Sequence, residues 1–343
     1  MDLPKQFYNW LESKESDLPE FSENALTNLI LEYGQAQTDT YLSSIKASMP
    51  KIIEENKLSN SSFLNNHLIH WAEPLNLLEL LVSECINIGS KYNLERKPDK
   101  EPSYATHIGL LVRLHGKACA IANEILFLLK NGFPDAAQAR WRSLHEINVT
   151  LYFIAKHGIP CSERFLAHGI IDSYELMKSH KNYEHRLQEK GPSQKESEEI
   201  QNLYNETIKK YGADFKKQYG WATPFIDRNG SGNIGFQSIE KNVNLDHMRP
   251  YFKWACQNIH INIKTITNSL SSPVFNADII NIGPSNFGLT DPAHAMALSI
   301  MQATCCLINT NPTLENIITA NALRKLAEEI GDSFLSVSNK LEK

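Results

Sequence analysis

Apolar residues recur at helical spacing over most of the chain, and the longest such run with charge in its middle covers residues 133–158. Pro134 suits the first turn of a helix here, and Gly158 suits the position just after its end. Val149 and Phe153 put apolar surface on a second side, so the sequence predicts a buried central helix. At about 100° per residue, its main apolar face consists of Ala136, Ala137, Leu144, Ile147, Leu151 and Ile154.

Similar stripes predict further helices on both sides of the central one. Their ranges are residues 7–11, 24–33, 38–56, 75–92, 104–129, 162–189, 247–270, 292–309 and 312–339. Residues 190–211 are rich in lysine and glutamate, which predicts an exposed helix or lid. Alternating polar and apolar runs do not recur, so strands are not expected. The predicted fold class is all-α, a multi-helix and mostly antiparallel bundle, because short connections such as Asn131 and Gly132 join antiparallel neighbours.

The clearest break in this pattern is the stretch ERKPDKEP at residues 95–102. It is charged and contains prolines, which is typical of a linker or a long loop. We therefore predict an N-terminal helical layer over residues 1–98 and a main helical domain over residues 99–343. A second irregular stretch, residues 219–236, is rich in glycine, and long loops of this kind are often functional.

The composition is that of an ordinary globular protein: 343 residues, of which 42% are apolar, can bury a large core. The net charge of -5 creates no general attraction for nucleic acid, so DNA is not expected as a partner and RNA would need a local basic patch. The sequence has no run that would span a bilayer and no apolar core of a signal peptide, which predicts a cytoplasmic protein without a membrane partner. The six cysteines lack CxxC spacing and are expected to be reduced core residues.

Charged residues within the central helix give the main chemical signal. Arg140 falls inside the apolar stripe, so its guanidinium is expected to be paired with an acid from a neighbouring helix or to line a polar pocket. Asp172 and Glu124 are the candidate acids. If the pair is structural and buried, Arg140→Ala would destabilise the fold by roughly 3–5 kcal/mol. The polar residues that follow on the same helix are Arg142, His145 and Glu146.

Other segments offer polar residues for a pocket beside this helix. Arg164, His168 and Asp172 recur at every fourth position and form a polar ridge, which is either a wall of the pocket or a solvated face with ion pairs. Trp221 lies in the glycine-rich loop. His260 lies where the apolar stripe of the predicted helix over residues 247–270 meets its polar stripe.

Four segments together resemble a family of bacterial proteins catalogued as a domain of unknown function. They are ARWRSLHE at residues 139–146, YGWA at 219–222, LDHMRPYFKWACQNIHIN at 245–262 and GPSNFGLTDPAHAMALS at 283–299. The resemblance covers residues 100–310 and implies a helical cytoplasmic protein without an established activity. With the polar ridge, these segments supply the candidate substrate-binding residues, which are Arg142, Glu146, His168, Trp221, His260 and Asn286.

Arg140 and His145 are separated by four residues, as in the R-x4-6-H signature of HEPN ribonucleases. This resemblance implies a helical protein of a toxin or phage-defence system that cleaves RNA without a metal or cofactor, usually as a homodimer. Histidine would accept a proton near neutral pH, and arginine would stabilise the phosphorane charge. Trp141 departs from the pattern, which commonly has a polar residue there, and residues five apart on a helix point about 140° from each other. The resemblance predicts Arg140 and His145 as the catalytic pair.

Two other functions fit the same residues. One is a non-enzymatic binding or regulatory module in which Arg140 belongs to a buried structural network. The other is a metal-binding helical bundle, although the chain lacks the repeated Glu-x-x-His pattern of di-iron bundles. The candidate metal ligands are His145, Glu146, His168, Asp172 and His260.

Overall fold

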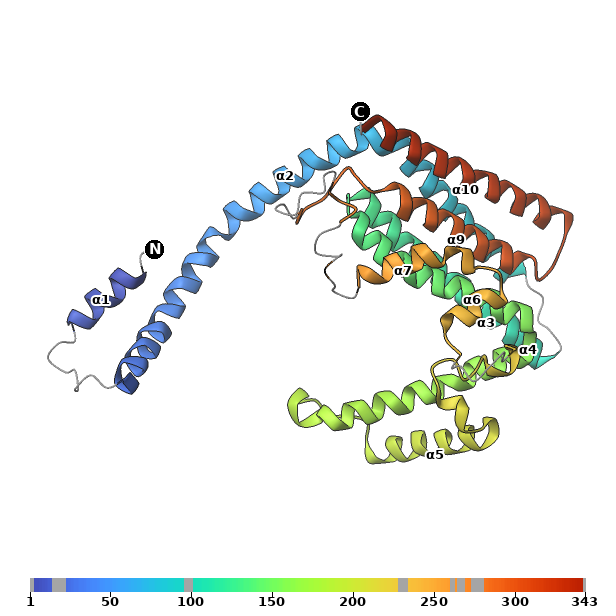
Figure 1. Cartoon of the computed structure of the whole chain (residues 1–343), viewed down its shortest axis with the longest axis horizontal. Coiled ribbons are helices and arrows are strands. Elements are labelled where there is room, and N and C mark those ends of the chain that lie inside the picture. Colours follow the sequence, from blue (N-terminus) through green and yellow to red (C-terminus); the bar gives the residue numbers. More distant parts are fainter. Residues whose placement is uncertain are drawn as a thin grey trace. The chain divides into compact units, whose positions relative to one another are not determined.

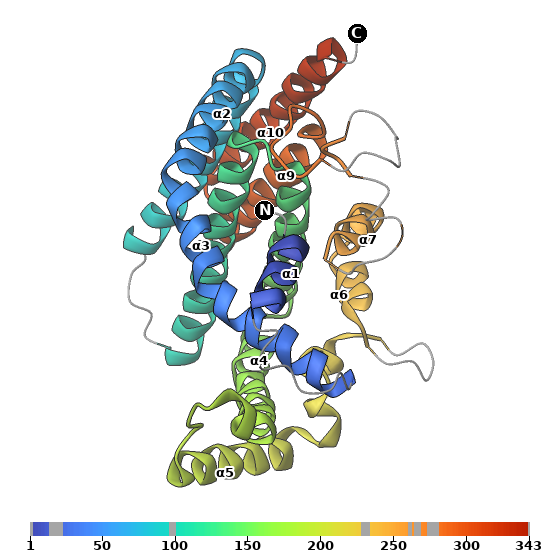
Figure 2. The ribbon, with the colours of Figure 1, turned by 90° about the vertical axis from the view of Figure 1, so that its left-hand side faces the viewer.

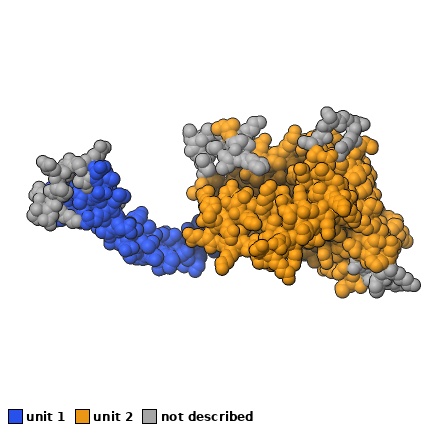
Figure 3. Space-filling model, turned by 90° about the horizontal axis from the view of Figure 1, so that it is seen from below, with its two compact units in different colours: residues 1–66 blue, residues 67–343 orange. Residues whose placement is uncertain are grey.

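The computed structural model describes residues 3–13, 23–95, 101–227, 234–259, 263, 269–272 and 281–341. Every regular element in these residues is a helix, which confirms the predicted all-α class (Figure 1). By the contacts among its Cα atoms, the chain divides into unit 1, Met1–Asn66, and unit 2, His67–Lys343 (Figure 3). None of the described helices is both long enough and apolar enough to cross a bilayer.

Unit 1 contains α1, Leu3–Ser13, and the first part of α2, Glu23–Glu95. The two helices are joined by aromatic packing, since the ring centroids of Phe7 and Trp10 lie 5.2 and 5.1 Å from that of Tyr33. This contact buries Tyr33. The predicted helical segment at residues 7–11 is therefore confirmed as part of α1.

The prediction of several short helices between residues 24 and 92 is wrong, because α2 is one continuous helix. It runs through Pro50, which lies inside the predicted helix over residues 38–56, and through Pro74, after which a new helix was expected to begin. A proline removes one backbone hydrogen bond, but an established helix gains one for each further residue. Beside Pro74, the burial of Trp71 and Leu75 adds apolar stabilisation that the local sequence pattern does not contain.

Unit 2 is a helical bundle whose main members lie side by side (Figures 1 and 2). α3 and α4 are joined by the turn at residues 131–133, in which Gly132 adopts a φ of 74°, so the predicted helix ends at this turn are confirmed. α9 packs against α3, α4 and α10. Besides the second part of α2, these members are α3 (Pro102–Lys130), α4 (Pro134–Leu187), α9 (Thr290–Ile308) and α10 (Leu314–Leu341).

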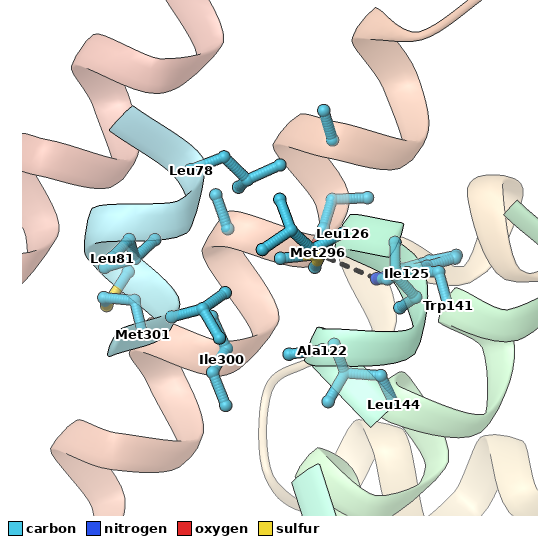
Figure 4. Packing of buried hydrophobic residues seen from close by; sticks show 14 of the residues in the cluster. Leu78, Leu81, Ala122, Ile125, Leu126, Trp141, Leu144, Met296, Ile300 and Met301 are labelled. Atoms are coloured by element: carbon cyan, nitrogen blue, oxygen red, sulfur yellow. Dashed lines mark hydrogen bonds between the residues drawn. The ribbon is translucent and has the colours of Figure 1, made fainter. Parts of the chain in front are cut away.

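The bundle core forms where α2, α3, α4 and α9 meet (Figure 4). Trp141 of α4 is fully buried there, and its indole Nε1 donates to the backbone oxygen of Ala295 and to Ser299 Oγ, both at 3.0 Å. The central helix is therefore buried, as predicted. Other members of the cluster are Leu78, Leu81, Ile125, Leu144, Met296 and Ile300.

The predicted helices over residues 133–158 and 162–189 form the single kinked element α4. The kink lies at Gly158, whose φ of 66° and ψ of −151° are not helical, and Pro160 follows it. Beyond the kink, α4 packs against α5, Gln194–Tyr211, which has no fully buried residue and fits the predicted exposed helix.

The boundary between the two units lies before the predicted domain boundary at residue 98. The reason is that α2 residues from Trp71 to Cys85 belong to the same core cluster as α3, α4 and α9. Residues 96–100, in the predicted linker, lie outside the described residues. All six cysteines are free, as predicted; Cys256 and Cys306 are half-buried and the other four are buried.

Short helices follow α5 in unit 2 and return the chain to α4. α6 and α7 both contact α4 (Figures 1 and 2). The predicted helix over residues 247–270 is described as a regular helix only to Gln257. The short elements are η1 (Ala213–Lys216), η2 (Thr223–Phe225), α6 (Phe236–Asn242), η3 (Asp246–Met248) and α7 (Arg249–Gln257).

Candidate functional site

A buried hydrogen-bonded triad joins α4 to α6 and α7. His145 is 1% exposed and its Nε2 lies 3.0 Å from Oε1 of Glu240, which is 0% exposed. The other oxygen of Glu240, Oε2, accepts a hydrogen bond of 2.7 Å from Nη1 of Arg249. An ionised carboxylate can only accept, so His145 donates through Nε2 and Glu240 connects the imidazole to the guanidinium. The triad fixes both short helices against the central helix.

A second arginine, Arg142, contacts the same aromatic ring as Arg249 of the triad. The Cζ atoms of Arg142 and Arg249 each lie 5.3 Å from the centroid of the Phe252 ring. Arg142 Nη2 lies 2.9 Å from Oε1 of Glu146, one turn along α4. The side chains of Arg142 and Arg249 are 28% and 22% exposed, so both are partly accessible to solvent. We call Arg142, Glu146, Glu240, Arg249 and Phe252 the arginine cluster.

Tyr219 adds a phenol to the arginine cluster. Burial raises the pKa of its hydroxyl, and the carboxylates of Glu146 and Glu240 raise it further, while Arg142 and Arg249 act in the opposite direction. The hydroxyl therefore stays protonated near neutral pH and is able to donate a hydrogen bond.

Several buried polar atoms near the cluster have no hydrogen-bond partner within the part of the chain that the structure describes. They are Nε of Arg142, Nε of Arg249 and both polar side-chain atoms of the fully buried Gln138. Gln138 lies one turn before Arg142, so the two side chains are neighbours on α4. Because buried polar groups are nearly always hydrogen-bonded, this side of α4 has unused hydrogen-bonding capacity.

Arg140 points to a different neighbour. It forms an ion pair with Glu124 of α3, which confirms the predicted partner. The pair is not the buried one of the first alternative, since the side chains of Arg140 and Glu124 are 32% and 49% exposed. A long arginine side chain can lie along apolar surface and keep its charged head in water. Arg140 thus contacts α3 whereas His145 contacts α6, and the structure does not bring the two side chains together within one chain.

We expect Arg140→Ala to change the free energy of unfolding by less than about 1 kcal/mol, because exposed ion pairs contribute little. This replaces the larger loss expected for a buried pair. Urea unfolding of the wild type, Arg140→Ala, Glu124→Ala and the double variant measures both the loss and the coupling energy. A loss of several kcal/mol would show that the pair is desolvated in solution.

His168 and Trp221 hold the segment after α5 against α4 and do not enter the arginine cluster. Nε2 of His168 lies 3.0 Å from the backbone oxygen of Lys217, and its Nδ1 lies 3.9 Å from an oxygen of Asp172. Trp221 is buried, and its ring lies 5.0 Å from that of Phe165 in an edge-to-face arrangement. Both predicted binding residues therefore have packing roles in this structure.

Asn286 and His260 also lie outside the cluster as described. Oδ1 of Asn286 is 2.6 Å from Nδ1 of His67, and its backbone oxygen accepts a hydrogen bond of 3.2 Å from Trp71 Nε1. These bonds attach the connector before α9 to α2. His260 lies outside the described residues.

The metal candidates are not assembled into one group among the residues that are described. His145 is bonded to Glu240, Glu146 pairs with Arg142, and His168 lies against the segment after α5. Within the described ranges, no set of three or more His, Cys, Asp or Glu side chains is placed to hold a metal ion.

Arg142, His145 and Glu146 were predicted from the sequence, whereas four residues that complete the site were not. Tyr219, Arg249 and Phe252 lie within the segments YGWA and LDHMRPYFKWACQNIHIN, so the family resemblance contained a signal for them. Glu240 lies outside those segments, in the short helix α6, and the sequence carried no comparable signal for it.

Residues 108–277 match the model of a family described as a family of unknown function (DUF5677). This match supports the predicted resemblance to a domain of unknown function, and it includes every residue of the arginine cluster. Comparisons with curated proteins and with solved structures found no match. The resemblance to HEPN ribonucleases stays a prediction.

Proposed function

We propose that the protein binds RNA, without a metal, by engaging a backbone phosphate at the arginine cluster. The proposal is carried by one observation: Arg142 and Arg249, from separate helices, converge on the ring of Phe252 with their side chains partly exposed. A guanidinium presents five N–H donors in a planar fork that matches phosphate oxygens. Each arginine has a carboxylate partner that leaves several of these donors unused.

The surroundings of the two arginines favour an anionic ligand. Glu240 is buried and stays with Arg249 and His145, whereas the half-buried Glu146 is able to turn towards water and release Arg142 to a phosphate. The protonated hydroxyl of Tyr219 is a further donor. RNA is the expected ligand because of the resemblance to HEPN proteins, and a net charge of -5 requires a local site of this kind.

The geometry favours binding over cleavage by Arg140 and His145. A general base has to come within about 3 Å of the hydroxyl that it deprotonates. His145 is buried and bonded to Glu240, and Arg140 pairs with Glu124 of α3. Cleavage by this pair would need both side chains to leave these partners, or a second copy of the chain to supply one of them.

Arg142→Gln is expected to weaken the affinity for single-stranded RNA at least about tenfold, since a hydrogen bond to a charged group contributes roughly 1.5–3 kcal/mol. The slope of the affinity against salt concentration, on logarithmic axes, should fall by about 0.7 for one lost phosphate contact. Fluorescence anisotropy with a labelled oligonucleotide measures both quantities.

Arg140→Gln is the matched control, because it lies on the same helix, is similarly exposed and also pairs with a carboxylate. It should bind RNA as the wild type does. Equal RNA affinity of the wild type, Arg142→Gln and Arg140→Gln would contradict the proposal. Incubation with RNA in EDTA tests cleavage on the same samples: cyclic-phosphate ends from the wild type, absent with His145→Ala, would favour a ribonuclease over a binding module.

A further inference from the structure

A pocket lies beside the part of α4 that follows the kink, apart from the residues of the arginine cluster. Arg164 of α4 lines it, together with residues from the end of α5 and from the segment that follows. Other lining residues are Tyr211, Ala213, Asp214, Phe215 and Thr223. A charged side chain at the wall of a pocket is a candidate for ligand recognition.

The guanidinium of Arg164 is held in place by the segment after α5. Its Nε donates to the backbone oxygen of Trp221 and its Nη2 donates to that of Gly220, both at 2.9 Å. Its Cζ lies 4.8 Å from the ring centroid of Tyr211 and 4.9 Å from that of Phe215. These two rings stack on each other with centroids 4.5 Å apart. The charge is thus fixed by carbonyl dipoles and aromatic faces.

Arg164 lacks an acidic partner within the described ranges of the chain, since no carboxylate there lies within ion-pair distance of it. Asp214 also lines the pocket, but its carboxylate pairs with Lys217 at 2.9 Å. Two of the five N–H donors of Arg164 are used by the backbone, which leaves three. A partly buried arginine is normally paired with an anion, so these donors lack the partner that such a group usually has.

We infer that this pocket binds a small molecule through its oxyanion, a phosphate or a carboxylate group, with Arg164 as the anion-binding residue. The fixed guanidinium has little conformational freedom left to lose when the anion binds, which favours affinity. Tyr211 and Phe215 provide an apolar surface beside it for the rest of the ligand. This inference does not depend on RNA binding at the arginine cluster.

Isothermal titration with inorganic phosphate, and separately with acetate, tests the inference on the full chain. Saturable binding of at least one probe is expected, and the probe that binds identifies the oxyanion. Because the arginine cluster is itself proposed to bind a phosphate, the titration is repeated with Arg142→Gln, in which binding at the Arg164 pocket should persist. Binding of neither probe, or binding lost in Arg142→Gln, would overturn the assignment to Arg164.

Ala213 offers a test that leaves Arg164 and its hydrogen bonds in place. Ala213 lines the pocket at the start of η1 and is exposed, so a larger polar side chain there should be tolerated. Ala213→Glu is expected to place a carboxylate beside Arg164 and weaken binding at least tenfold, whereas the uncharged Ala213→Gln should bind more nearly as the wild type does. Equal binding by the two variants would also overturn the inference, and thermal melts of both confirm that they are folded.

Discussion

Arg249→Ala is expected to destabilise the protein by about 3–5 kcal/mol, because it removes the cation from a buried carboxylate. Glu240 is fully buried and its two oxygens are bonded to Arg249 and His145. Without Arg249, Glu240 keeps only its hydrogen bond with His145. Its carboxylate would have to be desolvated without a counterion, take up a proton, or pull α6 open to water, and each of these costs free energy. Urea unfolding followed by circular dichroism measures the loss.

Two further variants separate the loss of charge from the loss of a side chain. Glu240→Gln combined with Arg249→Ala removes the buried charge as well, so the double variant should recover part of the stability lost in Arg249→Ala. Arg324→Ala is the surface control, since Arg324 pairs with Glu328 on the exposed side of α10 and should matter by at most about 1 kcal/mol. A loss in Arg249→Ala no larger than that of Arg324→Ala would mean that water reaches Glu240.

The structural role of Arg249 also decides which variant can test ligand binding. A fall in RNA affinity in Arg249→Ala would be ambiguous, because the variant loses both a donor and the attachment of α7. Arg142 pairs with the half-buried Glu146, so its replacement leaves Glu240 paired. Arg142→Gln is therefore the informative change for function, and Arg249→Ala is the informative change for the fold.

The sequence predicted best the features that follow local rules. The turn with Asn131 and Gly132 separates α3 from α4, and Gly158 marks the kink of α4, because both glycines adopt a positive φ that other residues avoid. The continuity of α2 through Pro74 depends instead on the burial of Trp71 and Leu75 against helices far along the chain. A local pattern cannot contain that information.

Only the site residues on the central helix α4 could be predicted from the sequence pattern. Arg142 and His145 stood out because they interrupt an apolar stripe, whereas Glu240 and Arg249 lie on short helices whose position is set by tertiary contacts. Arg140 was predicted as a site residue because its angular position on the central helix places it inside the apolar stripe. That angle does not reveal that its long side chain reaches the exposed edge of α3, where Glu124 pairs with it.

Trp141→Ala is expected to destabilise the protein by about 3–5 kcal/mol, the range for removing a large aromatic side chain from a core. Trp141 is fully buried between α4 and α9, where its indole donates to Ala295 and Ser299 (Figure 4). Alanine would leave a cavity and two acceptors without their donor. Thermal and urea unfolding measure the loss.

Trp141→Phe separates packing from hydrogen bonding at this position, since it keeps an aromatic ring and removes the N–H. A loss of roughly 1–3 kcal/mol is expected, from the unsatisfied acceptors. Trp141 also occupies the position after Arg140 where HEPN motifs commonly carry a polar residue, and its side chain faces the core rather than a substrate. Trp141→Phe should therefore lower stability while leaving RNA affinity unchanged. A variant that kept its stability but lost RNA binding would place Trp141 in the binding site and contradict a purely structural role.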